Sequence, residues 1–424
     1  MSLKKVLEEQ RKLVELDSKT AGYLRDETKK VVEVLRKETA KQKIEAEIFV
    51  GGSFAKGTLE KKEIYDIDIF FRFDWKFDDL SDILEKIVRK ANRELNLVVK
   101  KIHGSRDYFR LKNKNVAFEI VPVYKIRHPK EARNVTDLSY FHVNYVKKKI
   151  KKSNLAREIM LAKKFFQSQR VYGAETFISG FSGYGIECLI VNYGSFERML
   201  RGLSKVEPGE RLILDPGRLY KKKQDVLFDM NESKLHSPVI LVDPTWKERN
   251  VLAALSCEVF RKLQEAARKF LKDPSRRFFE IEKLDLNSLK KLKGEFLHVK
   301  IETDRQEGDI AGSKMKKFSR FLMQESRKYF DILRSEFVYF DGKESDFYLV
   351  LKPKREVVKF GPPVKMEKSV REFNKRNNDV FERDGMLYAR VKVDFSGKEF
   401  LMGIAKKELG RKIKEMGITG MKIN

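Results

Sequence analysis

Two neighbouring segments decide the fold of this chain, and they read Gly51-Gly52-Ser53-Phe54-Ala55-Lys56-Gly57-Thr58 and Asp66-Ile67-Asp68-Ile69-Phe70-Phe71. The first has adjacent glycines, which let the backbone approach an anion, and a serine whose N–H and hydroxyl can donate to it. The second alternates acidic and apolar residues, which predicts a strand with both aspartates on one face and the isoleucines in the core. We therefore expect a phosphate-binding turn beside two convergent carboxylates.

The spacing of the two aspartates suits a metal site. Residues two apart on a strand have Cα atoms roughly 6.5 Å apart. Both carboxylates can therefore reach cations spaced about 3.5 to 4 Å, as two-metal phosphoryl transfer requires. The alternative is that they form the solvent-facing side of an amphipathic strand. The glycine spacing also resembles a P-loop, but Thr58 stands where that motif requires lysine, which excludes this reading.

A third carboxylate, Glu119, lies in the apolar run Val116-Ala117-Phe118-Glu119-Ile120-Val121-Pro122-Val123. A lone carboxylate among such residues is costly to bury unless it is paired or bound to a metal. We therefore expect Glu119 to be a third metal ligand on a neighbouring strand. A Gly-Ser turn, an Asp-x-Asp strand and a later single carboxylate together resemble the layout of polymerase-β-like nucleotidyltransferases.

The charge of the chain points to a polyanionic partner. Its 424 residues are enough for two to four domains, and 91 Lys and Arg stand against 63 Asp and Glu, a net charge of +28. Nucleic acid is the first candidate for such a basic surface. A membrane surface is the rival, but the sequence has no long uncharged apolar run of the transmembrane kind.

The cysteine and histidine content indicates in which cellular compartment the protein is found and which kind of metal ion it can bind. Only Cys188 and Cys257 occur, too few for a disulfide framework, and the charged start has no apolar segment of the signal-peptide type. We therefore expect a reduced, cytoplasmic location. The two cysteines and five histidines have no zinc-binding spacing, so any metal would be held by oxygen, which suits Mg²⁺.

Hydrophobic periodicity predicts a mixed α+β chain. A helix over 79–92, strands near 97–99 and 108–111, and the strands at Asp66 and Glu119 predict a compact domain that ends near residue 140. A helical region follows, including 155–169. Later, a predicted helix over 314–335 alternates with predicted strands over 347–351 and 386–391.

Several further motifs follow in order along the chain. With the turn and the three carboxylates, they resemble the archaeal, class I CCA-adding tRNA nucleotidyltransferases over roughly the first 260 residues, and more weakly beyond. The motifs are Glu119-Ile120-Val121-Pro122, Val171-Tyr172-Gly173-Ala174-Glu175, Gly180-Phe181-Ser182-Gly183-Tyr184, Asp243-Pro244 and Glu248-Arg249-Asn250-Val251.

The resemblance implies an α+β architecture in four parts. These are a polymerase-β-like head (1–143), a helical neck that selects the nucleotide (144–272), a mixed α/β body (273–318 and 380–424) and a tail that binds tRNA (319–379). It also implies an enzyme that adds C, C and A from CTP and ATP to the 3′ end of tRNA, without a template and with two Mg²⁺ ions. The tRNA acceptor arm would be the partner, and a homodimer is left open.

The same resemblance implies a role for individual residues. Asp66, Asp68 and Glu119 would hold the metal ions, although the family often has Glu-x-Asp followed by Asp. The resemblance places Gly52, Ser53, Lys56, His142, Lys163 and Tyr172 at the triphosphate and sugar, and Arg249 at the incoming base. Lys56 stands where relatives have arginine, so its contact would lack a bidentate fork.

Four of these residues also have an ordinary structural interpretation. His142 would be an interior histidine, Lys163 a surface lysine and Tyr172 a packing residue. Arg249 would form a surface ion pair with Glu248 or Asp243. Two alternative functions also stay open: another template-independent RNA nucleotidyltransferase, either poly(A)-type or adding only part of CCA, and a non-catalytic RNA-binding protein.

Overall fold

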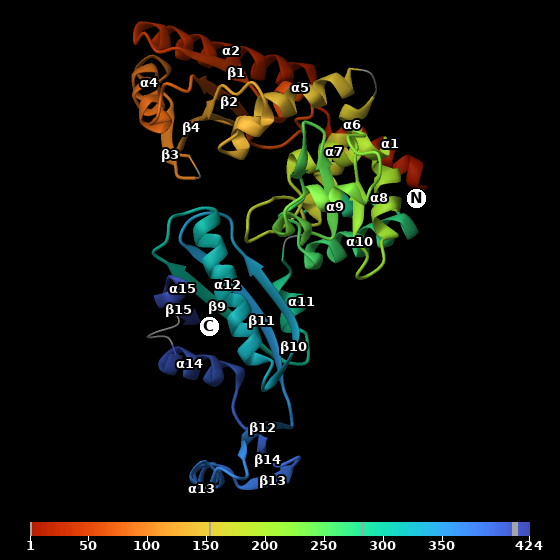
Figure 1. The fold of residues 1–424 in the computed structure, drawn as a ribbon, viewed down its shortest axis with the longest axis vertical. Coiled ribbons are helices and arrows are strands. Elements are labelled where there is room, and N and C mark those ends of the chain that lie inside the picture. The colour runs from red at the N-terminus through yellow and green to blue at the C-terminus, as the bar shows by residue number, and fades with distance from the viewer. Residues whose placement is uncertain (1, 105, 152–153, 282–283, 409–413) are drawn as a thin grey trace. The chain divides into compact units, whose positions relative to one another are not determined.

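The structure, a computed structural model, describes residues 2–104, 106–151, 154–281, 284–408 and 414–424. The chain divides into two compact units, Met1–Ile281 and Glu282–Asn424. Figure 1 shows the first in red to green and the second in green to blue. The finer division into head, neck, body and tail stays a prediction. None of the described helices is both long and apolar enough to cross a membrane.

A five-stranded sheet forms the core of the N-terminal part of the first unit. Its strand order is β1-β2-β5-β4-β3, and only the central β2–β5 pair is parallel. This confirms the predicted strands at Asp66 and Glu119, because the apolar and β-branched residues of both strands are buried. The strands are β1 (Ala46–Val50), β2 (Tyr65–Phe73), β3 (Val98–Ile102), β4 (Tyr108–Asn113) and β5 (Val116–Tyr124).

Two helices, α2 (Ser18–Lys41) and α4 (Leu80–Leu95), pack against each other and cover one face of this sheet (Figure 1). Asp17 caps α2 by accepting a hydrogen bond from the Thr20 N–H at 2.8 Å. Ile67 and Ile69 are fully buried beneath these helices. Asp66 and Asp68 therefore lie on the opposite face of β2, as the alternation predicts.

The rest of the first unit is mainly helical. Its hydrophobic core contains many aliphatic side chains and a group of aromatic rings that includes Phe165, Phe196, Phe270 and Phe279, all at most 2% exposed. The short helix α3 (Gly52–Lys56) precedes β2, and the small sheet has the order β6-β7-β8. The other elements are α1 (Leu3–Val14), α5 (Ser139–Ile150), α6 (Leu155–Ser168), α7 (Gly183–Tyr193), α8 (Phe196–Ser204), β6 (Leu212–Leu214), α9 (Asp225–Asp229), β7 (Val239–Asp243), β8 (Trp246–Asn250) and α10 (Cys257–Lys272).

The described residues of the second unit form two sheets. An antiparallel sheet with the order β10-β11-β9-β15 packs against α12, and a three-stranded sheet with the order β12-β14-β13 packs against α13. The elements are α11 (Leu286–Lys290), β9 (Glu295–Thr303), α12 (Asp309–Ser326), β10 (Phe330–Val338), β11 (Glu344–Pro353), β12 (Glu356–Pro363), α13 (Glu367–Arg376), β13 (Asp379–Arg383), β14 (Met386–Lys392), α14 (Gly397–Glu408), α15 (Lys414–Met416) and β15 (Ile418–Ile423).

The predicted helix over 314–335 is wrong in its last part. Helix α12 ends at Ser326, and residues from Phe330 onward form β10, which pairs with β11. Phe330 and Ile332 are two residues apart and both pack into the core beneath the sheet. The apolar spacing over 330–335 fits a helix as well as a strand, and it is the pairing with β11, the next strand along the chain, that decides for a strand.

Candidate active site

The glycine turn is fixed directly to the strand that carries the aspartates. The N–H of Gly51 donates to the backbone carbonyl of Asp68 at 2.8 Å. Gly52 has a φ of +60°, and a Cβ atom at this position would lie 2.6 Å from Cγ of Asp68. Only glycine therefore allows both this backbone conformation and this close approach. The glycine turn and the Asp68 carboxylate therefore lie side by side on the same wall of the site.

A cleft of about 260 Å³ opens at this wall. Among its lining residues are seven predicted from the sequence, and Glu119, His142 and Arg249 are not among them. The lining residues are Gly52, Ser53, Lys56, Lys62, Asp66, Asp68, Lys163, Tyr172, Gly183, Tyr184 and Glu187.

The three predicted metal ligands lie on adjacent strands. Asp68 on β2 stands beside Glu119 on β5 in the parallel register. Burial, and next the negative charge of Glu119, raise the pKa of Asp68 to about 7. Asp66 accepts a hydrogen bond from Lys62 Nζ at 2.7 Å, and Glu119 accepts one from Arg110 Nη2 at 2.5 Å. Two of the three carboxylates are therefore already paired with cations.

These carboxylates fit a divalent metal by their chemistry and charge. Carboxylate oxygens are the ligands that Mg²⁺ prefers. Burial, and next the negative charge of Glu119, raise the pKa of Asp68, and a bound cation would offset both effects. Within the described part of the chain, however, no group of three or more His, Cys, Asp or Glu residues has an arrangement that could hold a metal ion. The ion pairs at Asp66 and Glu119 would have to change on metal binding.

The cationic side of the cleft is organised by Glu187, on α7. Its Oε2 accepts a hydrogen bond from Lys56 Nζ at 2.8 Å, and its Oε1 accepts one from Lys163 Nζ at 2.9 Å. Lys163 is 2% exposed, so its surface reading is wrong. Burial works against the charge of Glu187, but the positive charges of Lys163 and Lys56 lower its pKa to about 2.

A second buried carboxylate, Asp243, contacts two of the three predicted residues that do not line the cleft, His142 and Arg249. His142 Nε2 lies 3.1 Å from Asp243 Oδ2, and Arg249 Nη1 donates to the same oxygen at 2.6 Å. The Tyr184 hydroxyl donates to Oδ1 at 3.0 Å, and its ring stacks on His142 at 3.8 Å. The interior reading of His142 and the pairing of Arg249 with Asp243 are therefore both observed, and Tyr184 links this cluster to the cleft.

Burial has opposite consequences for the two partners in this cluster. It lowers the pKa of His142. It also works against the charge of Asp243, but the hydrogen bond from His142 and the Arg249 guanidinium hold the pKa of Asp243 well below its usual range. Asp243 thus stays ionised and can hold Arg249 in place.

Tyr172 completes the wall of the cleft between the glycine motifs. It pairs through an isolated β-bridge with Phe181, and a Cβ atom at Gly183 would lie 2.8 Å from its hydroxyl. Its position agrees with both interpretations made from the sequence, because Tyr172 packs against the hydrophobic core of this region and also lines the cleft.

Sequence-based reasoning did not single out Glu187, Tyr184 or Asp243 as site residues. A signal was present for Glu187, which is a lone carboxylate in the apolar run Ile186-Glu187-Cys188-Leu189-Ile190. The same reasoning that selected Glu119 applies to it. Asp243 gives a similar signal, because it ends the fully buried strand β7.

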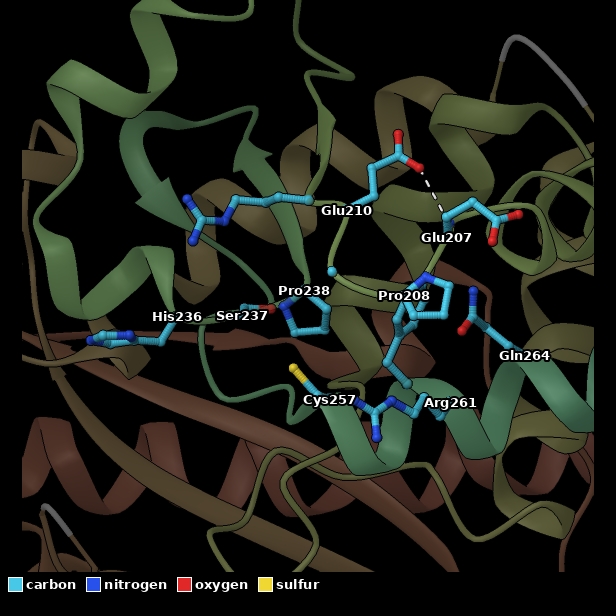
Figure 2. A pocket seen from close by; sticks show the side chains of 12 residues that line it. Glu207, Pro208, Glu210, His236, Ser237, Pro238, Cys257, Arg261 and Gln264 are labelled. Atoms are coloured by element: carbon cyan, nitrogen blue, oxygen red, sulfur yellow. Dashed lines mark hydrogen bonds between the residues drawn. The ribbon is translucent and has the colours of Figure 1, made fainter.

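A second cavity, of about 140 Å³, lies in the same unit near the start of α10 (Figure 2). It is lined by the loop 207–211, residues 236–238 and four residues of α10, including the free thiol of Cys257. Its acidic residues, Glu207 and Glu210, are exposed, and the N–H of Glu207 donates to Glu210 Oε2 at 3.2 Å. None of the predicted site residues lines this cavity, so the chemistry belongs to the cleft.

Comparison with known proteins agrees with this geometry. The profile of the nucleotidyltransferase domain matches residues 29–137, and that of the second domain of tRNA nucleotidyltransferases matches residues 157–280. The CCA-adding enzyme of Nanoarchaeum equitans is 32% identical over 356 residues, which cover 82% of this chain and 85% of that enzyme. The CCA-adding enzyme of Methanocaldococcus jannaschii is 31% identical over 365 residues, which cover 82% and 78%.

Solved structures with low sequence identity share the fold. A cytoplasmic RNA terminal U-transferase matches with a TM-score of 0.51 at 14% identity, over 66% of this chain and 98% of that one. The Cid1 poly(U) polymerase matches with a TM-score of 0.52 at 14% identity, over the same shares. The predicted nucleotidyltransferase fold is thereby confirmed.

Proposed function

Because the chain belongs to the family of CCA-adding enzymes, we propose that it adds C, C and A in turn to the 3′ end of tRNA, taking the nucleotides from CTP and ATP. One observation supports this most directly. A single cleft holds an anion-binding turn, two carboxylates and two buried lysines, which are the groups that transfer of a nucleotide from a triphosphate needs.

The triphosphate would lie against the turn. Gly52 and Ser53 would offer backbone N–H groups and a hydroxyl, and the ammonium groups of Lys56 and Lys163 would neutralise phosphate charge. Tyr172 would close the side of the cleft near the sugar. Holding the triphosphate in this way would direct its α-phosphate toward the aspartates.

The carboxylates would serve the metal. Nucleotidyltransferases of this kind generally use divalent metal ions, and we propose Mg²⁺, held by Asp66 and Asp68 with Glu119 beside them. When bound, such ions stabilise the attacking and leaving oxygens of the transfer. The chain's own part is to hold these acidic groups on one face of two adjacent strands.

The base of the incoming nucleotide would be recognised at the Asp243 cluster, which Tyr184 links to the cleft. Arg249 presents several N–H donors and no acceptor, so it can complement the acceptor edge of C while phosphates of the RNA provide acceptors for amino groups. Its pairing with Asp243 would fix the direction of these donors. His142, which contacts both Asp243 and Tyr184, would stabilise the same arrangement.

CCA-adding enzymes act on tRNA with CTP and ATP. For this chain we propose that the acceptor arm and 3′ end are bound through backbone and shape, which its net charge of +28 supports. The four-part division with a tRNA-binding tail over 319–379, a homodimeric state and a cytoplasmic location remain part of this proposal. Two free cysteines, Cys188 and Cys257, are compatible with a reducing compartment.

The test is incorporation of labelled CTP and ATP into tRNA that lacks its terminal CCA, resolved at single-nucleotide length. We expect growth by three nucleotides with Mg²⁺ and none after chelation by EDTA, because the acidic residues then lack their cation. A ladder of A, or an arrest after two C, would identify a related enzyme instead. Tight tRNA binding without any incorporation of nucleotides would indicate a non-catalytic RNA-binding protein.

The ion pair between Lys62 and Asp66 gives a separate prediction about the metal site. A metal at Asp66 must compete with the Lys62 ammonium, which lies 2.7 Å from Asp66 Oδ2 in a partly exposed pair. Since such pairs stabilise by at most ~1 kcal/mol, Lys62→Met should bind Mn²⁺ up to roughly fivefold more tightly than the native chain. Titration of free Mn²⁺ by electron paramagnetic resonance, without nucleotide, measures this. The neighbouring exposed Lys61, changed to Met, is the control, and equal affinities in both variants would contradict the prediction.

A further inference from the structure

The cluster of Glu187 with Lys56 and Lys163 is almost sealed from solvent. The side chains of Glu187, Lys163 and Lys56 are 1%, 3% and 9% exposed. Thr58 belongs to the same cluster, because its hydroxyl donates to Glu187 Oε1 at 2.9 Å and accepts from Lys163 Nζ at 3.1 Å. Each oxygen of Glu187 therefore accepts from a different lysine.

The charges in this cluster do not cancel. One buried carboxylate faces two ammonium groups, which leaves one positive charge on the side of the cleft that also contains Ser53. Burying an ammonium is unfavourable without a countercharge, and a shared carboxylate offsets part of this penalty for both lysines. Glu187 thus supplies a shared countercharge for two lysines beside the cleft.

The cluster also joins segments that are far apart in the sequence. Lys56 ends the short helix α3 after the glycine turn, Lys163 lies on α6, and Glu187 lies on α7. Lysine has a single charged head on a flexible stem and no fork that fixes its direction. A carboxylate anchored on α7 can supply the direction that Lys56 itself lacks.

We propose that Glu187 is a positioning residue of the nucleotide site, which holds the ammonium groups of Lys56 and Lys163 at a fixed place and separation for the triphosphate of CTP or ATP. This inference rests on the proposed function. It assigns to Glu187 a role through the two lysines and no contact with the nucleotide. The glutamate therefore decides nucleotide affinity although it carries the same sign of charge as the substrate.

The sign of the effect separates this proposal from simple charge attraction. Glu187→Gln keeps the size of the side chain and removes one negative charge, so attraction alone would predict tighter binding of the triphosphate. Positioning predicts the reverse, because the amide has one acceptor oxygen and can hold only one of the two lysines. We expect the KM for CTP and ATP and the Kd for Mg·CTP to rise roughly 10- to 100-fold, with the KM for tRNA nearly unchanged.

A matched control is available in the same unit. Glu158 on α6 is also buried, accepts from Arg11 Nε at 2.7 Å and from the Phe196 N–H at 2.8 Å, and does not line the cleft. Glu158→Gln should lower the thermal stability about as much as Glu187→Gln does, and it should leave the KM for CTP unchanged. If both variants change the KM for CTP to the same extent, Glu187 acts only through stability and the proposal is wrong.

A second variant covers the case that Glu187→Gln does not fold. Glu187→Asp keeps the charge but shortens the side chain by one methylene, so this variant should fold. It should bind Mg·CTP more weakly than the native chain. Its affinity should still exceed that of a folded Glu187→Gln variant. Calorimetric titration of the full chain with Mg·CTP measures this. Native affinity in Glu187→Asp together with native or tighter affinity in Glu187→Gln would overturn the proposal. Absence of CTP binding to the unchanged chain would instead refute the proposed function.

Discussion

The Asp68→Asn variant is expected to lose nucleotide addition by roughly 10³-fold or more in kcat while it keeps its fold. Asp68 lies on the cleft side of β2, next to the glycine turn and beside Glu119. An amide has the same shape but no charge, so it can no longer attract and hold a divalent cation. Single-turnover incorporation of CTP into tRNA lacking CCA measures the loss.

The stability of this variant should change in the opposite direction. The pKa of Asp68 is raised to about 7 in the folded chain, above the value of 3.8 usual for aspartate. Ionisation therefore favours the unfolded state, and the folded state loses stability as the pH rises from about 4 through 7. Asp68→Asn removes this loss, so its Tm in EDTA at pH 8 should equal or exceed that of the native chain.

The control for both measurements is Asp78→Asn, an exposed position before α4 that does not line the cleft. It should keep native activity and native stability. A folded Asp68→Asn variant with native activity would contradict the assignment of Asp68. A clearly lower Tm at pH 8 would show instead that its charge stabilises the fold.

Gly52→Ala should be the second variant with a large effect. Gly52 has a φ of +60°, and an added Cβ would overlap the Asp68 carboxylate. The left-handed backbone alone disfavours alanine by roughly 1–2 kcal/mol. The overlap must in addition shift Asp68 or the turn. Because a displacement of about 1 Å at reacting groups can reduce rates roughly 100-fold, we expect at least such a loss in kcat/KM for CTP.

Gly57→Ala separates the two effects. Gly57 ends the same turn with a φ of +70°, and an added Cβ there would meet no atom within 4 Å. Gly57→Ala therefore introduces the backbone strain without the overlap. It should lower the Tm to a degree comparable with Gly52→Ala, while most of the activity remains. If the two alanine variants were equally active, the close approach of the turn to Asp68 would not matter for catalysis.

Local patterns were sufficient to predict the turn, the Asp-x-Asp strand and a neighbouring strand that carries Glu119. Alternation along β2 determines which side chains are buried, and this depends only on residues close in sequence. The partners of these carboxylates could not be predicted in the same way. Arg110 reaches Glu119 because β4 and β5 pair, and Lys62 reaches Asp66 from the segment just before β2.

The cationic half of the cleft depends still more on the tertiary fold. Lys56, Lys163 and Glu187 come together only when α3, α6 and α7 have packed. Tyr184 and Asp243 meet in the same way, 59 positions apart along the chain. The lone carboxylates in apolar runs indicated that partners must exist, because an unpaired buried charge is costly, but composition alone does not identify them.

The order of the segments along the chain has a consequence for synthesis on the ribosome. The carboxylates on β2 and β5 are complete once residue 124 has emerged, whereas Glu187 and Arg249 follow much later. Chains fold from the N-terminus as they are made, at roughly 5 to 20 residues per second. For several seconds a nascent chain would therefore display the acidic groups without the anchored lysines. It could meet metal ions before it could retain a nucleotide, so the unfinished protein would not consume CTP.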